Sequence, residues 1–290
     1  MKTKHFILTG ILAVSLAGVI ITGCKKSTTS PDTDATAAQD DANATFAIQD
    51  TKNSADGAAK GQATEGPEHS FTCATWRWDS SASTDTLVIS YPGTCVSPDG
   101  RTRKGNIIVY WPRGAGYFTN GSVITMTFKN YSFTNIGGTV ISVTGTRTLT
   151  NTGKDSLGDY NWNFNANLTL NYSTGGSATW NSSRTNTLMK STTISNFYYY
   201  SITGSASGTS KSGVGYNISI STTNPLTYAA NWINYVLYAR SPCYCIESGQ
   251  LTFTRTGKTY PLYLTYTSGL GNCNYTASAT INGNTYNIVF

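Results

Sequence analysis

Acid–base and nucleophilic chemistry have few candidate residues in this sequence. His69 is the only histidine after residue 5, so neither a Ser-His-Asp nor a Cys-His arrangement has a convincing base. Asp99 stands before Gly100 and reads as a turn residue. We therefore expect no enzyme, and a two-carboxylate glycan hydrolase is the least favoured alternative. The carboxylates available to it are Asp79, Asp85, Asp99, Asp155, Asp159 and Glu247.

The densest basic cluster is formed by Arg101, Arg103 and Lys104. Such a cluster can engage a phosphate-bearing lipid or polysaccharide, or it can keep a hairpin from pairing with another sheet edge. We favour the charged hairpin and keep the anion patch as the alternative. The sequence has no basic groove interleaved with aromatic residues, so we expect no nucleic-acid partner.

Exposed aromatic rings are the main sign of a possible sugar ligand. Tyr198, Tyr199 and Tyr200 are consecutive, so a strand there places rings on both of its faces. Trp180 lies in a polar stretch. Trp180 and Tyr199 are therefore candidate ligand-facing rings, whereas most other aromatic side chains are expected to pack the interior.

Five cysteines lie beyond residue 24. In an oxidising compartment they are expected to form disulfides, and we favour Cys73–Cys95 and Cys245–Cys273. Cys243 is then left over, although it could exchange roles with Cys245. A zinc site is the sharper alternative, but this Cys-x-Cys has no second close pair and no histidine beside it. We expect neither a metal nor another cofactor.

Residues 1–23 are expected to form a signal peptide. Lys2 and Lys4 precede the apolar run Phe6–Ile21, as in secretory signals. Ile21-Thr22-Gly23-Cys24 resembles the lipobox of bacterial lipoproteins. This resemblance implies acyl chains on Cys24 and therefore a membrane as a partner, since two or three chains anchor a protein stably. Lys25 rather than Asp follows, which favours the outer membrane; the periplasmic and extracellular faces both stay open.

Residues 24–69 are expected to form the lipidated cysteine and a disordered tether. Lys25–Glu68 is rich in Ala, Thr, Asp, Ser and Gly, with Phe46 and Ile48 as its only large apolar residues. Such a segment cannot bury enough apolar surface to offset its chain entropy.

Residues 70–290 are expected to form a single all-β domain. Tyr160–Tyr172 alternates aromatic or aliphatic residues with Asn or Thr, which predicts a long strand with one buried face. Gly175-Gly176 and Asn282-Gly283 predict hairpin turns. Only Pro225–Arg240 is compatible with a short helix or an irregular crossover. The predicted fold is an antiparallel meander that forms a sandwich or a strongly curled sheet.

Two parts of the domain look related. Gly93-Thr94-Cys95 and Gly271-Asn272-Cys273 are each followed, after nine residues, by a Gly-Asn pair between apolar strands. We expect two four-strand-like units at residues 73–111 and 245–290.

The segment Cys95–Trp111, with Asn130-Tyr131, Gly145-Thr146-Arg147-Thr148 and Asn151-Thr152-Gly153, resembles a group of uncharacterised β-rich lipoproteins of Bacteroidota. The resemblance implies a secreted lipoprotein with an all-β fold and carries no catalytic residues. We therefore expect a lipid-anchored envelope or cell-surface protein with a structural, adhesive or interaction role. The alternative is a carbohydrate-binding module that aids glycan capture. Partners other than the membrane would be a glycan or another envelope protein, and the oligomeric state stays open.

Overall fold

The computed structural model describes residues 32–61, 73–81, 83–97, 99–156, 159–230, 245–272 and 274–290. These residues belong to one folded unit, which begins at Asp32. The predicted signal peptide and Cys24 lie outside the described residues.

One helix and fourteen strands are found in the described part of the chain. The elements are α1 (Thr36–Gly61), β1 (Thr75–Ser80), β2 (Thr84–Val96), β3 (Thr102–Pro112), β4 (Val123–Thr134), β5 (Val140–Lys154), β6 (Tyr160–Tyr172), β7 (Ser177–Lys190), β8 (Tyr198–Thr209), β9 (Gly215–Ile220), β10 (Leu226–Ala229), β11 (Ile246–Arg255), β12 (Leu262–Thr267), β13 (Thr276–Ile281) and β14 (Asn284–Val289).

All fourteen strands form a single antiparallel sheet, and nearly all of them pair with their neighbours in the sequence. The exception is that β9 and β10 do not pair with each other: both pair with β8 on one side and β11 on the other. This arrangement confirms the predicted all-β meander and selects the curled sheet over the sandwich. The long strand predicted at Tyr160–Tyr172 is β6, with the same bounds and with strict alternation along most of its length. In the ambiguous segment Pro225–Arg240, Leu226–Ala229 forms the strand β10, and residues 231–240 lie outside the described residues.

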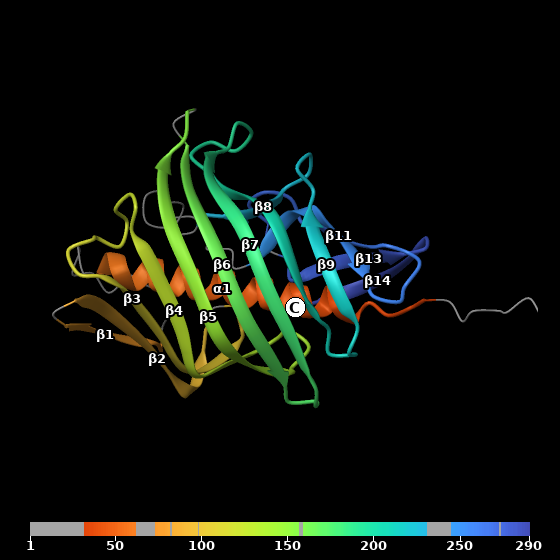
Figure 1. Ribbon diagram of the computed structural model, residues 1–290, viewed down its shortest axis with the longest axis horizontal. Coiled ribbons are helices and arrows are strands. Elements are labelled where there is room, and N and C mark those ends of the chain that lie inside the picture. The colour runs from red at the N-terminus through yellow and green to blue at the C-terminus, as the bar shows by residue number, and fades with distance from the viewer. Residues whose placement is uncertain are drawn as a thin grey trace, which may run out of the picture. The chain divides into compact units, whose positions relative to one another are not determined.

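The helix α1 differs from the sequence-based prediction. Residues 36–61 were expected to belong to a disordered tether, but they form a helix of 26 residues. Asp34 caps its start, since its Oδ1 accepts a hydrogen bond of 3.0 Å from the Thr36 main-chain N–H. In Figure 1, α1 (orange) runs across the strands behind β5 to β9. It contacts β2, β6, β7 and β14, so both the middle and the two ends of the sheet curve towards it.

Polar contacts, together with the buried side chains of Phe46, Ile48 and several alanines, hold α1 against the sheet. Its carboxylates Asp41 and Asp50 are almost completely buried. Asp50 accepts hydrogen bonds of 2.9 and 2.7 Å from Arg103 of β3, and Asp41 accepts one of 3.2 Å from Arg184 of β7. Each charge is neutralised by a partner from the opposite element, which is the condition under which buried charges are tolerated. For residues 36–61 the tether prediction was wrong because it counted only apolar surface.

An irregular stretch of β4, opposite Gly105 of β3, helps the sheet to bend around α1. The β3–β4 register shifts next to Gly105, and the β4–β5 register shifts between Thr127 and Ser132. Gly105 has φ +89°, and a Cβ there would lie 2.0 Å from the Asn130 carbonyl oxygen. A side chain is therefore excluded where the strand bends.

The two units that were predicted to be related lie at opposite ends of the sheet, and the first contains three strands where four were expected. Residues 73–111 contain β1 to β3, and residues 245–290 contain β11 to β14. The ends approach each other at Arg101, whose guanidinium lies 3.6 Å from the ring centre of Phe46 and 4.6 Å from that of Tyr275. Arg101 also donates a hydrogen bond to the main-chain oxygen of Phe290. One arginine thus links the β2–β3 hairpin, the helix and the end of β14.

Candidate functional site

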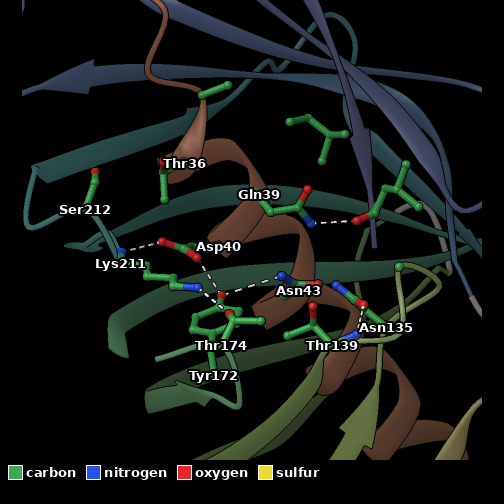
Figure 2. Close-up of a pocket in the computed structure, with 14 residues that line it drawn as sticks. Thr36, Gln39, Asp40, Asn43, Asn135, Thr139, Tyr172, Thr174, Lys211 and Ser212 are labelled. Atoms are coloured by element: carbon green, nitrogen blue, oxygen red, sulfur yellow. Dashed lines mark hydrogen bonds between the residues drawn. The ribbon is translucent and has the colours of Figure 1, made fainter. Parts of the chain in front are cut away.

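A pocket of about 710 Å³ lies at the N-terminal end of α1. Figure 2 shows how side chains from five parts of the chain converge on it. The helix supplies one wall, and the others come from the loop after β4, the end of β6, the β8–β9 turn and the edge of β14. Its volume falls within the range of about 300–1,000 Å³ that is usual for small-molecule sites. The polar lining residues are Thr36, Gln39, Asp40, Asn43, Asn135, Thr139, Tyr172, Thr174, Lys211 and Ser212.

Asp40 is the one carboxylate among the residues that line the pocket. Its Oδ1 accepts a hydrogen bond of 2.5 Å from the Tyr172 hydroxyl, and its Oδ2 accepts one of 2.6 Å from the Lys211 main-chain N–H. Burial raises the pKa of Asp40 to about 6, although both hydrogen bonds favour the ionised form. The carboxylate therefore changes charge in a mildly acidic range.

Asn43 is the most unusual polar residue of the pocket. It is completely buried, and its Oδ1 accepts no hydrogen bond from any described residue. Its amide nitrogen donates only a long hydrogen bond of 3.5 Å to the Tyr172 hydroxyl. A buried acceptor without a donor costs about 1–3 kcal/mol. A ligand with an O–H or N–H group would remove that cost.

Gln39 and Lys211 add further polar groups at the rim. Gln39 donates through Nε2 to the Val289 carbonyl at 2.7 Å, which directs the amide between α1 and β14. The Lys211 ammonium donates to the Thr174 hydroxyl at 2.7 Å and lies 4.8 Å from the ring centre of Tyr172. The pocket therefore presents amides, hydroxyls and one ammonium group, and it can hydrogen-bond a small polar ligand in both directions.

The predicted carboxylates do not meet as a catalytic pair at this pocket. None of the six lines it; its one carboxylate, Asp40, belongs to the segment predicted to be a tether. Asp99 binds Arg103 at 2.7 Å, and although burial acts to raise the pKa of Asp99, hydrogen bonds from Arg103 hold it below its usual value. Burial raises the pKa of Glu247 to about 7, and the Gly271 main-chain N–H donates to its Oε2 at 3.2 Å.

The prediction that Arg101, Arg103 and Lys104 form a basic patch on the surface is wrong. Arg101 and Arg103 are each only 1% exposed, and Lys104 alone is exposed. Successive strand residues point to opposite faces, so Arg103 points to the helix and Lys104 to solvent. The carboxylates that these arginines bind are the protein's own: Arg103 pairs with Asp50 and Asp99, and Arg101 lies 3.5 Å from Asp99.

Neither candidate sugar-stacking ring is freely exposed. Trp180 is completely buried and donates a hydrogen bond of 2.7 Å from its indole N–H to Asp41. Tyr199 is half-buried and packs against the core. Trp180 was wrongly predicted to be exposed because its strand, β7, carries polar residues on both faces. The inward face of that strand meets the polar helix.

The predicted Cys73–Cys95 disulfide is present, with the two Cα atoms 5.3 Å apart. Cys245 is buried, but its predicted partner Cys273 and the neighbouring Cys243 lie outside the described residues. The Cys245–Cys273 pairing therefore stays a prediction. His69 also lies outside them.

Sequence reasoning missed Gln39, Asp40 and Asn43. A signal was nevertheless present in the strands. Arg184 shares the inward phase of β7 with Trp180 and Leu188, and Arg147 occupies an inward position of β5. Arginines on a buried face require acceptors, and the acidic segment 32–56 holds them.

Comparison of the chain with protein-family models, with curated proteins and with solved structures gives no match. The resemblance to Bacteroidota lipoproteins accordingly stays a prediction. No helix in the described part of the chain has the length and apolar character needed to span a membrane.

Proposed function

We propose that this protein is a lipid-anchored envelope protein with an interaction role, and that its folded unit binds a small, hydroxyl-rich ligand such as one unit of a glycan. The observation that carries the proposal is the buried, unpartnered Oδ1 of Asn43 in a pocket of about 710 Å³ lined by amides and hydroxyls. It favours the carbohydrate-binding alternative over a purely structural role.

Sugars suit this lining because each hydroxyl both donates and accepts hydrogen bonds. A ligand hydroxyl donating to Asn43 satisfies an atom that has no donor among the described residues, and the Lys211 ammonium is a donor at the rim. Ile288 and Val289 add an apolar patch against which C–H groups of a sugar ring can pack. Because only one carboxylate lines the pocket, we propose binding rather than hydrolysis.

The proposed anchor is Cys24, eight residues before the folded unit begins at Asp32. A fully extended chain spans at most about 3.6 Å per residue, so eight residues reach no more than about 30 Å. The protein would thus keep its folded unit near the lipid surface of the outer membrane, on its periplasmic or extracellular face. Metabolic labelling with a radioactive fatty acid tests this, and loss of label in Cys24→Ala is the expected result.

The ligand proposal is tested by titrating the unlipidated Cys24→Ala protein with neutral mono- and disaccharides in a calorimeter. The matched variant is Asn43→Ala, and Thr254→Ala at an exposed position of β11 is the control. We expect Asn43→Ala to weaken binding at least tenfold and to leave the melting temperature equal or higher, because it removes an unsatisfied buried group. No binding by any saccharide at high micromolar concentration would refute the proposal.

A further inference from the structure

The outer face of strands β5 to β9 carries no charged residue over most of its length. The outward positions are every second residue of each strand, from 142 to 150 in β5, 161 to 171 in β6, 177 to 187 in β7, 201 to 209 in β8 and 217 to 219 in β9. Every one of these positions is Ser, Thr or Asn, and all are exposed or half-buried. In Figure 1 these strands lie in front of α1, so this face is turned towards the viewer.

The fold does not require such a composition. Lys and Glu are accepted at outward strand positions, and about a quarter to a third of a typical soluble surface is charged. Lys154 and Lys190 stand at the ends of β5 and β7, so charge is present at the borders of this face but not within it. The uncharged face is thus a distinct property of the central strands.

The short polar side chains form rows across the strands. Thr148, Asn165, Ser183, Ser205 and Ser219 are in register from β5 to β9. Neighbouring strands lie about 4.8 Å apart, and outward residues repeat about every 6.8 Å along a strand. The face therefore offers a periodic array of groups that both donate and accept hydrogen bonds.

The array is hollowed between two of its rows. A depression of about 370 Å³ lies over β6 to β9, and no residue of α1 lines it. Its lining includes the inward positions Ala166, Ser182, Ala206 and Ile218. Its outward lining residues are Asn181, Ser183, Ser205, Ser207 and Asn217. Because these side chains are short, the main chain between the rows stays open to a ligand.

We propose that this outer face binds a chain of a neutral polysaccharide. An anionic lipid or nucleic acid would find no cation on it, and an apolar partner would find no apolar patch. A neutral polyhydroxyl chain requires no desolvation of charge, and short Ser, Thr and Asn side chains lose little rotamer entropy when they are ordered. A periodic polymer can repeat the same hydrogen bonds from row to row, so weak contacts add along its length.

This surface is separate from the pocket beside α1, because no residue lines both. The two sites are therefore tested independently. The measurement is affinity electrophoresis of the Cys24→Ala protein in native gels that contain dextran, a soluble β-glucan or mannan, with alginate as an anionic comparison.

The face variant is Ser183→Lys combined with Ser205→Glu. The two positions are direct cross-strand partners, so the substitutions form an opposite-charge pair and leave the net charge unchanged. The control variant is Thr252→Lys combined with Tyr263→Glu, an equivalent outward pair on β11 and β12. Asn43→Ala serves as the pocket variant, and thermal melting confirms that each variant is folded.

We expect at least one neutral polysaccharide to retard the parent protein, and we expect its dissociation constant to rise tenfold or more in the face variant only. Several results would overturn the proposal: no retardation by any neutral polysaccharide, equal retardation of the face variant, or loss of retardation in Asn43→Ala alone, which would place all binding at the pocket. A dimer of the parent protein that the face variant abolishes in sedimentation would also overturn it, because a second copy would then cover the face.

Discussion

The ion pair between Asp50 of α1 and Arg103 of β3 is the sharpest test of how the helix is held. Asp50 accepts two hydrogen bonds from Arg103, at 2.9 and 2.7 Å, and one of 2.8 Å from the Tyr131 hydroxyl. The perturbation is Asp50→Ala. It removes the carboxylate and leaves the guanidinium and the phenol without this partner in the interior.

The expected loss can be worked from these contacts. Removing one partner of a buried pair costs about 3–5 kcal/mol. Arg103 keeps Asp99 at 2.7 Å, so the lower value of about 3 kcal/mol applies, and the orphaned Tyr131 hydroxyl adds about 1 kcal/mol. We therefore expect Asp50→Ala to lower the free energy of unfolding by about 4 kcal/mol. For a unit of this size that corresponds to a fall in melting temperature on the order of 10 °C.

The assay is urea unfolding followed by tryptophan fluorescence, together with hydrogen exchange of the α1 amides. The matched control is Asp79→Ala, because the Arg77–Asp79 pair is 68% and 66% exposed with a separation of 3.6 Å. An exposed pair of this kind contributes about 0–1 kcal/mol. In a double-mutant cycle, Asp50→Ala and Arg103→Met should show a coupling of about 2 kcal/mol or more.

Two results would refute the reasoning. One is a loss below about 1 kcal/mol in Asp50→Ala, equal to that of the control. The other is exchange of the α1 amides within seconds in the parent protein, as expected of a disordered tether and not of a buried helix.

Three further predictions concern groups at other points of the fold. The pKa of Asp40, raised to about 6 from an ordinary 3.8, means that the folded state retains this proton between about pH 4 and 6. Stability should therefore fall by roughly 2–3 kcal/mol as pH rises through that window, and Asp40→Asn should flatten the profile measured by urea unfolding. Reducing the Cys73–Cys95 disulfide, whose cysteines are 22 residues apart, should lower stability by about 3 kcal/mol, read from the urea midpoint with and without reductant. Trp180→Phe removes the N–H donor to Asp41 and should lower the free energy of unfolding by about 1–3 kcal/mol. It should also remove a blue-shifted component from the tryptophan emission spectrum, and an unchanged spectrum would contradict the burial of this ring.

The strands were predictable because their signal is local. Tyr160–Tyr172 alternates in the sequence and alternates in the structure, since side chains of a strand point to opposite faces in turn. The Cys73–Cys95 pairing was predictable for a similar reason, because the two cysteines bracket adjacent strands, β1 and β2.

The pocket was not predictable from the same signals. Asp40 and Asn43 belong to a segment whose composition favours disorder, and its polar residues become buried only because distant strands supply partners. Trp180, Arg184 and Arg103 each reach the helix from a strand far away in the sequence. Pairs between residues so far apart leave no local pattern in the sequence. The composition of residues 36–61 therefore indicated disorder, although they form the helix α1.

The sequence by itself thus determined the all-β class, the bounds of β6 and one disulfide, because strand alternation and turn chemistry act between near neighbours. The tertiary structure alone decided that residues 36–61 are a buried helix, that Arg101 and Arg103 point inward, and that a polar pocket forms where α1 meets β6 and β14. The physical reason is that a buried charge is stable only beside its partner, and here each partner is brought to its place by the curl of the sheet.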